Sequence, residues 1–342
     1  MPILAATAGV NFFYTDSGAP KSPEYTTIVI LHGYKWHSAV FARLLPLART
    51  RGIRIICVNR RGYPNSTPYT PEEAAALAST DPSRVLLDQG ILLSRFIAQL
   101  PDTLQLPQPS DGHAGEIALA GWSLGTLFVQ LVLASLDSVD EHTRVILRTR
   151  IRRVILWDIP SPFLGLGAPP GAYFPLTDNS KTLNERIDTF MTWVSGYYTH
   201  DVASRKPGYG DPDADLLPSV ESAPGLLALA ATTASVSGDT ALMRISLLPL
   251  MQRITEGTLL DPQLSRRWGG LQLHTITGSR SVWMCVLAPW WFEAAARKAG
   301  IRVEDQIILG ANHLVMWDNP EAAIRALQNC CIAVAASHKA HL

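Results

Sequence analysis

The stretch EIALAGWSLGTLFVQLVLASL, residues 116–136, places one serine, Ser123, between two glycines. A short apolar run leads into this serine, and a longer apolar run leads out of it. The first run is typical of a buried strand and the second of a helix. A Gly-x-Ser-x-Gly sequence at a strand-to-helix junction is typical of a sharp turn that presents a nucleophilic serine. The alternative is a serine that merely caps the helix.

A serine hydroxyl becomes a good nucleophile only when a base removes its proton, and the chain has nine histidines. His313, in LGANHLVMWDNPE (309–321), comes just after the last apolar run that predicts a strand. His32 also ends a predicted strand, but Gly33 follows it at once, and we expect His32 to shape that loop. Position therefore favours His313 as the base for Ser123.

Apolar runs rich in β-branched residues alternate with runs of helical spacing along most of the chain. Strands are predicted over 26–33, 53–62, 152–158, 271–279 and 305–313, and helices over 38–52, 83–100, around 290–300 and from 320 onward. Residues 63–73 are expected to form a loop. This alternation predicts an α/β fold with a mostly parallel sheet. The site is then expected at the carboxyl ends of the strands, where Ser123 and Asp158 lie.

The alternation stops between residues 159 and 270, which are rich in proline, glycine and aromatic residues. We expect this segment to be a mostly helical insertion that covers the sheet edge. The predicted organisation is an α/β core of residues 1–158 and 271–342 and a helical cap of residues 159–270.

Composition excludes several classes of protein. The 342 residues are 47% hydrophobic and 17% charged, with no net charge, which predicts a globular chain without a nucleic-acid partner. The four cysteines suit neither a disulfide scaffold nor a zinc site. No signal peptide or membrane span is predicted, so we expect a cytoplasmic location. The final Ala340-His341-Leu342 resembles a peroxisomal import signal and keeps that location open.

Four motifs together resemble the α/β-hydrolase fold superfamily. They are LHGY (31–34), NRRGYPNS (59–66), GWSLG (121–125) and GANHLVMWDNPE (310–321). The resemblance implies an eight-stranded sheet with helices on both faces, a helical cap after the sixth strand, and the order serine, acid, histidine. It also implies an oxyanion hole formed by the backbone N–H groups of Tyr34 and Leu124. Asn59 and Pro64 stand where the family usually has aspartate and glycine.

The acid departs from the commonest pattern of this family, which places an aspartate after the seventh strand. The corresponding stretch, GSRSVWMCVLAPWWFE (278–293), has no carboxylate before Glu293, which we expect inside the next helix. The known alternative is an acid after the sixth strand, and Asp158 occupies that position. A carboxylate there would orient His313. The competing interpretation is an aspartate that marks the root of the cap. Asp318 is expected to fix the loop that holds His313.

Candidate pocket residues come from the loop after the strand predicted over 26–33, from the turn at Ser123 and from the cap. They are His32, Lys35, Trp36, Trp122, Phe163, Tyr173, Phe174, Trp193, Tyr197 and Tyr198. The cap aromatics are at least as compatible with the cap's own core. Arg60 and Arg61 are expected to be structural, with a substrate carboxylate as the alternative partner, and Arg280 faces either the pocket or solvent.

The sequence thus predicts a serine hydrolase that cleaves an ester, thioester or lactone of a small to medium, largely apolar substrate. The expected catalytic residues are Ser123, His313 and Asp158, with no metal or organic cofactor. A non-hydrolytic enzyme of the same fold is the alternative: a cofactor-independent oxygenase, C–C bond hydrolase or lyase, acyltransferase or cyclase. A ligand receptor without activity is a third class. The expected partner is a small-molecule substrate, and a homodimer stays open.

Overall fold

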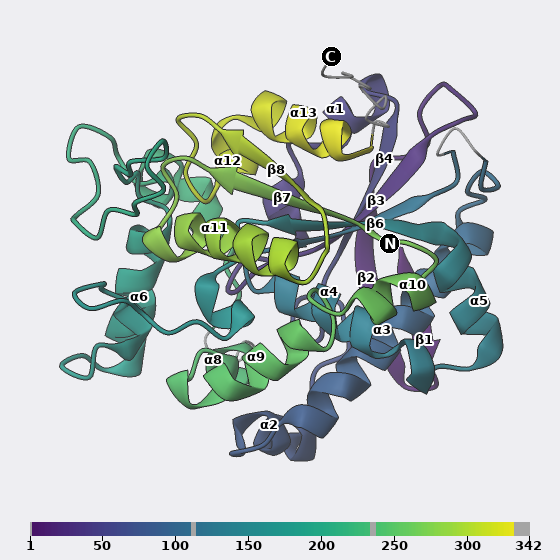
Figure 1. Ribbon diagram of the computed structural model, residues 1–342, viewed down its shortest axis with the longest axis horizontal. Helices are drawn as coiled ribbons and strands as arrows, with labels where there is room; N and C mark the ends of the chain where they lie inside the picture. The colour runs from purple at the N-terminus through teal and green to yellow at the C-terminus, as the bar shows by residue number, and fades with distance from the viewer. Residues whose placement is uncertain (1, 111–113, 233–236, 332–342) are drawn as a thin grey trace.

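The fold is built on one eight-stranded sheet, seen in a computed structural model that describes residues 2–110, 114–232 and 237–331 (Figure 1). The strand order is β1-β2-β4-β3-β5-β6-β7-β8. β2 pairs antiparallel with β1 and β4, and all other pairings are parallel. The strands are β1 (Ile3–Thr7), β2 (Val10–Asp16), β3 (Thr26–Leu31), β4 (Ile53–Val58), β5 (Ile117–Trp122), β6 (Ile151–Trp157), β7 (Gln272–Gly278) and β8 (Val303–Ile308).

Helices cover both faces of the sheet. α1 and α13 lie on one face, and α3, α4 and α5 lie on the other (Figure 1). The core helices are α1 (Leu45–Thr50), α2 (Pro71–Ala78), α3 (Ser83–Thr103), α4 (Gly125–Ala134), α5 (Glu141–Arg150), α11 (Trp283–Lys298), α12 (Val315–Asp318) and α13 (Pro320–Cys331). The predicted α/β fold, with a mostly parallel eight-stranded sheet between two layers of helices, is confirmed.

The central strands explain why the site lies where it does. Every residue of β3, β4 and β5 is buried, as expected for apolar strands sandwiched between helices. β5 and β6 run parallel and side by side, so the residues that follow them meet at the carboxyl edge of the sheet. Ser123 follows β5 and Asp158 follows β6, which brings both to the same edge.

Two local predictions differ from the structure. The helix expected over 38–52 is split into the 3₁₀ turn η1 (Ser38–Phe41) and α1, because Pro46 suits only the first turn of a helix. The loop expected over 63–73 gives way to α2 at Pro71. Thr70 and Glu73 form a capping box at the start of α2, a signal visible in the sequence as T-P-E-E.

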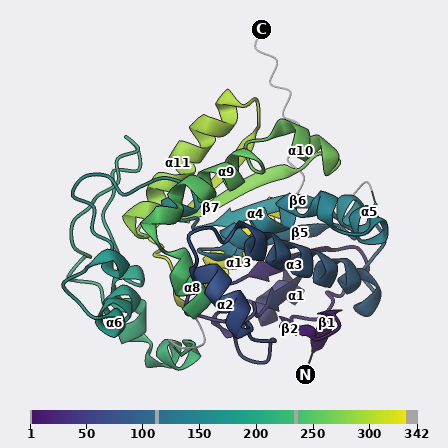
Figure 2. The same ribbon diagram turned by 90° about the horizontal axis from the view of Figure 1, so that it is seen from below.

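The segment between β6 and β7 consists of short helices and turns. Its elements are η3 (Ser161–Leu164), η4 (Pro175–Thr177), α6 (Leu183–Val194), α7 (Ser219–Ser222), η5 (Pro224–Leu229), α8 (Ser237–Leu242), η6 (Ile245–Leu247), α9 (Leu248–Glu256) and α10 (Pro262–Arg267). α6 lies at the outer side of the molecule in both views, and α8 lies beside α2 (Figures 1 and 2). We keep the name cap segment for residues 159–270.

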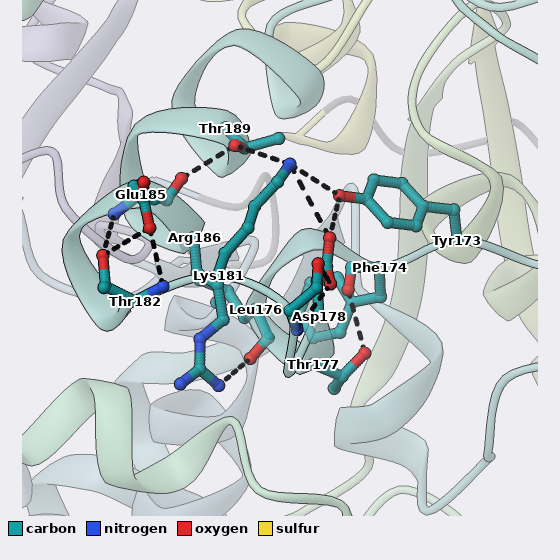
Figure 3. Close-up of polar contacts among 11 residues, drawn as sticks. Tyr173, Phe174, Leu176, Thr177, Asp178, Lys181, Thr182, Glu185, Arg186 and Thr189 are labelled. Atoms are coloured by element: carbon teal, nitrogen blue, oxygen red, sulfur yellow. Dashed lines mark hydrogen bonds and ion pairs between the residues drawn. The ribbon is translucent and has the colours of Figure 1, made fainter.

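The start of α6 is held by local polar contacts, which Figure 3 shows together. Thr182 and Glu185 form a second capping box. The Lys181 ammonium donates to the Thr189 and Tyr173 hydroxyls, and the Tyr173 hydroxyl donates to Asp178. The Tyr173 side chain is therefore engaged in fixing the turn before α6.

None of the helices in the described ranges combines the length and the apolar character that a bilayer crossing requires. The three residues Ala340-His341-Leu342 lie outside the described residues.

Candidate active site

Ser123 lies on a sharp turn between β5 and α4. Its φ angle of 55° is in the left-handed region, which side-chain-bearing residues rarely adopt. The Ser123 N–H donates to the Trp157 carbonyl oxygen at 2.9 Å, and the Ser123 carbonyl accepts from the Thr126 N–H at 3.0 Å. The turn is thus tied to the neighbouring strand and to the first turn of α4. Such local strain is characteristic of functional sites.

Three glycines allow the backbone to approach the serine this closely. A Cβ at Gly121 would lie 2.5 Å from the Gly125 carbonyl oxygen, and a Cβ at Gly33 would lie 2.9 Å from the Ser123 Cβ. A Cβ at Gly125 would overlap the Leu31 carbonyl group. The glycines that the sequence places around Ser123 are therefore required by contacts with backbone and with the serine itself.

Gly125→Ala should destabilise the fold, because the added methyl would push against the backbone of β3, which cannot move without disturbing the sheet. We expect a loss of about 2 kcal/mol or more in the free energy of unfolding, measured by urea denaturation. Gly225→Ala is the matched control, since a Cβ at Gly225 meets no atom within 4 Å. Equal stability of the two variants would contradict this account of the turn.

Asp158 accepts a hydrogen bond from His313 across the carboxyl edge of the sheet. The distance from His313 Nδ1 to Asp158 Oδ2 is 2.9 Å, and both side chains are fully buried. The Gly278 N–H donates to Asp158 Oδ1 and the Ser281 hydroxyl donates to Oδ2, each at 2.9 Å. The Asp158 backbone also has a positive φ, 46°. Three donors thus fix this carboxylate in one orientation behind the imidazole.

The loop around His313 is held by the cap segment and by the turn. The Asn312 amide donates to the Ser195 carbonyl and to the Ser219 hydroxyl, at 2.8 and 2.7 Å. Trp122 Nε1 donates to the His313 carbonyl oxygen at 3.1 Å, and the two rings lie 4.9 Å apart.

Asp318 links the same loop to the cap segment. Its carboxylate accepts from the Tyr197 hydroxyl at 2.8 Å and from the Ser219 hydroxyl at 2.5 Å. The pKa of Tyr197 is raised, first by burial and then by its hydrogen bond to Asp318. Tyr197 is thus engaged in holding the loop.

His32 is completely buried beneath the loop that follows β3. Its Nε2 accepts from the Arg60 N–H at 3.0 Å, so the proton of the neutral ring resides on Nδ1, which donates to the Gly33 carbonyl at 2.9 Å. Burial, and then the Arg60 charge, hold the pKa of His32 well below its usual value. His32 is therefore a neutral ring with both nitrogens engaged, which suits a role in shaping the loop.

Tyr34 and Leu124 are the two residues whose backbone N–H groups are expected to form an oxyanion hole, and both lie at the turn. Tyr34 is in the loop after β3, which packs on the turn through Gly33, and Leu124 directly follows Ser123. Within the described ranges, neither backbone N–H donates to a protein acceptor. Both N–H groups are therefore available to a ligand at the turn.

An apolar cavity of about 420 Å³ opens beside Ser123 and His313. Its other lining residues are Pro160, Pro162, Phe163, Phe174, Phe190, Trp193, Val194, Met243, Val282, Met284 and Cys285. Phe163, Phe174 and Trp193 are among the candidates that the sequence suggests. Phe190, Met243 and Met284 are lining residues that sequence reasoning missed, because nothing in a helical run shows which face meets the cavity.

Several other candidate pocket residues are engaged in packing around the site and do not line this cavity. Trp36 Nε1 donates to the Leu226 carbonyl, and the Lys35 ammonium to the Ala231 carbonyl. Trp122 lies beneath the His313 ring, and the Tyr198 hydroxyl donates to the Trp193 carbonyl. The polar groups of Trp36, Lys35 and Tyr198 thus bind carbonyl oxygens of the cap segment.

Three arginines near the site have carboxylate partners in the protein. Arg60 pairs with Asp239, Arg61 with Glu73, and Arg280 with Asp213. These pairs favour the structural role expected for Arg60 and Arg61.

The model of the alpha/beta hydrolase family matches residues 28–327, which include the turn, the acid and the histidine loop. The chain belongs to the α/β-hydrolase family. No curated protein sequence matches this α/β-hydrolase.

Solved structures of the same fold align over nearly the whole α/β-hydrolase chain. A putative aryl esterase from Burkholderia cenocepacia is 16% identical, with a TM-score of 0.57 and 96% of each chain covered. A thermophilic esterase from Thermogutta terrifontis is also 16% identical, with a TM-score of 0.56 and coverage of 96% of this chain and 97% of that one. Epoxide hydrolase A from Mycobacterium thermoresistibile is 17% identical, with a TM-score of 0.52 and coverage of 96% and 97%. At these identities, the likeness shows the fold alone.

Two polar residues of this α/β-hydrolase site were not found from the sequence. Ser281 lies in the stretch after β7 that has no carboxylate, and its hydroxyl donates to Asp158. The absence of an acid in this stretch is the one signal for a residue there that binds the acid after β6. Asn312 directly precedes His313, but its cap partners are more than ninety residues away in the chain. Among the described residues, no group of three or more histidine, cysteine or acidic side chains is arranged to hold a metal ion.

Proposed function

We propose that this α/β-hydrolase is a serine hydrolase that cleaves an ester, thioester or lactone of a small to medium, largely apolar substrate. The observation that carries the proposal is the 2.9 Å hydrogen bond between His313 Nδ1 and the buried Asp158 carboxylate. That bond leaves Nε2 of the imidazole without a proton in the neutral ring, and His313 lines the same cavity as Ser123. A base with this tautomer is what a serine nucleophile requires.

In the proposed reaction the Ser123 Oγ attacks the substrate carbonyl carbon while His313 Nε2 takes the hydroxyl proton. The carbonyl oxygen becomes an oxyanion, to which the Tyr34 and Leu124 N–H groups donate. Collapse of this intermediate breaks the bond to the alcohol or thiol, which leaves with the proton from His313. Water then attacks the acyl-serine, with His313 again accepting a proton, and releases the acid and Ser123. The Asp158 carboxylate stabilises the imidazolium in both steps through its hydrogen bond to Nδ1.

The cavity lining supports an apolar acyl group. Apart from Ser123, His313 and Cys285, the residues around the 420 Å³ space are aromatic, aliphatic, proline or methionine. Burial raises the pKa of the Cys285 thiol well above its usual value, so this group remains neutral. A charged substrate group would be desolvated here without a partner, which is unfavourable by several kcal/mol or more.

A fluorophosphonate probe tests the nucleophile directly. We expect stoichiometric labelling of the folded protein, with the added mass located by peptide mass spectrometry on Ser123. Folded protein that stays unlabelled would overturn the proposal. Labelling at Ser123 without release of acid from a panel of activated esters, thioesters and lactones would also overturn it and favour a non-hydrolytic reaction at the same residues.

A second cavity of about 540 Å³ adjoins the first and predicts a preference for longer acyl chains. The two cavities share Pro162, Phe174, Met243 and Met284. Met284→Trp should narrow the passage between them, and Met284→Ala should widen it. Since each buried methylene contributes about 0.8 kcal/mol, excluding two or three of them should lower kcat/KM roughly 15- to 60-fold.

The measurement is kcat/KM for p-nitrophenyl esters with acyl chains of increasing length. With Met284→Trp we expect kcat/KM for acetate and butyrate esters to stay within about threefold of wild type. For octanoate and decanoate esters, kcat/KM should fall roughly 15- to 60-fold. Met284→Ala should shift the preference in the opposite direction. A uniform change over all chain lengths would contradict a substrate path through the second cavity.

A further inference from the structure

A buried ion pair joins the cap segment to the core next to the turn. Arg60 follows β4, and Asp239 lies in α8. Their side chains are 1% and 2% exposed, and the guanidinium donates to both carboxylate oxygens at 2.9 and 2.6 Å. The Arg60 guanidinium also lies 4.2 Å from the centre of the Phe128 ring. Buried ion pairs of this kind are stable only when further hydrogen bonds satisfy their remaining groups.

The further hydrogen bonds of this pair reach the loop after β3, directly from Arg60 and by way of Tyr63 from Asp239. Arg60 Nε donates to the His32 carbonyl at 3.0 Å, and Nη2 donates to the Gly33 carbonyl at 2.9 Å. The Tyr63 hydroxyl donates to Asp239 at 2.6 Å and accepts from the Lys35 N–H at 3.1 Å. Three backbone groups of residues 32–35 are therefore set by a network whose anionic centre belongs to the cap segment.

The Gly33 carbonyl and the Tyr34 N–H belong to one peptide unit. Because a trans peptide is planar, its C=O and N–H point in opposite directions, and fixing one fixes the other. The Arg60 contact on the Gly33 oxygen thus aims the Tyr34 N–H away from Arg60. The positive charge beside the oxygen also polarises the peptide, which strengthens its N–H as a donor.

We propose that Asp239 is a positioning residue that acts through Arg60 on the Tyr34 N–H, so that this donor is in place only while α8 is docked on the core. The inference rests on the proposed function, in which the Tyr34 N–H stabilises the oxyanion. A second contact has the same effect: the Tyr34 hydroxyl and the Thr240 hydroxyl of α8 are 2.8 Å apart. Cap docking and transition-state stabilisation are coupled through these few contacts.

Asp239→Asn tests the coupling, because it keeps the shape of the side chain and removes the charge that holds Arg60. We expect kcat for p-nitrophenyl butyrate to fall about 10- to 100-fold with KM within threefold, since outright loss of one oxyanion donor costs about 10²–10³ in kcat. The Ki of an alkyl trifluoromethyl ketone, whose hemiketal oxyanion needs the same donors, should rise by a similar factor. Rates are divided by the fraction of protein that a fluorophosphonate labels.

Asp16→Asn is the matched control, because Asp16 forms a comparable two-point pair with Arg54, at 3.0 and 2.6 Å, between β2 and β4. It should leave kcat and Ki of the labelled fraction within threefold of wild type. Tyr63→Phe serves as a second variant should Asp239→Asn fold poorly, with an expected three- to tenfold fall in kcat and a matching rise in Ki.

The outcomes separate this inference from the proposed function. A wild-type protein that is neither labelled nor active would overturn both. Two outcomes in a labelled, active wild-type background would overturn the coupling alone. One is that Asp239→Asn or Tyr63→Phe leaves kcat and Ki unchanged. The other is that Asp16→Asn shows the same losses as these variants.

Discussion

Ser123→Ala is expected to lower the turnover of short-chain activated esters by about 10⁶-fold, to the level of the background reaction. The change deletes the Oγ that forms the acyl intermediate in the proposed reaction and leaves the rest of the cavity intact. Alanine at a φ of 55° is no more strained than serine there, so the free energy of unfolding should change little. The measurement is ester hydrolysis together with labelling by the fluorophosphonate probe.

The matched control for Ser123→Ala is Ser222→Ala, which removes an exposed hydroxyl of α7. It should be labelled and active like wild type. Residual turnover of Ser123→Ala within a hundredfold of wild type, in protein free of wild-type contamination, would mean that another group carries the reaction.

Asp158→Asn is expected to lower kcat by about 10³- to 10⁴-fold, with a folded protein and little change in KM. The Gly278 N–H can only donate, so the asparagine oxygen should face it and turn the amide NH₂ toward His313. Nδ1 must then accept, which moves the imidazole proton to Nε2. A histidine protonated at Nε2 cannot take the proton of Ser123.

Glu293→Gln is the control for the acid, because Glu293 is the first carboxylate after β7. It lies in α11 and pairs with Arg205 and Arg297, so its replacement should leave kcat within threefold of wild type. A near-normal rate of Asp158→Asn, or a large loss in Glu293→Gln, would place the acid elsewhere.

The residues best predicted from the sequence are those that follow strands directly. Buried parallel strands are recognisable from short runs of apolar residues, and the chain geometry of a parallel sheet then brings Ser123 and Asp158 to one edge. His313 follows β8 after a short turn and was found by the same logic. The catalytic roles of Ser123, Asp158 and His313 stay a proposal. Their positions at the carboxyl edge of the sheet can be predicted without knowing how side chains pack.

Residues of the cap segment were much harder to place, for a physical reason. Short helices joined by proline- and glycine-rich turns have no fixed register with the sheet, so the sequence does not show which side chain faces the cavity. Tyr173 points to Asp178 and Lys181, whereas Phe190, which no sequence pattern singles out, lines the cavity. The pairing of Asp239 with Arg60 spans 179 positions of the chain and left no local signal.

Asp158 is both the hydrogen-bond partner of His313 and the last residue before the cap segment. Its N–H donates to the Ile276 carbonyl at 2.7 Å, which anchors the chain where it leaves the sheet. A cap that swung about this point would pull the carboxylate away from the imidazole and dismantle the site each time the protein opened. The proposed function therefore requires that substrate enters and product leaves through movements farther along the segment, with its root kept stationary.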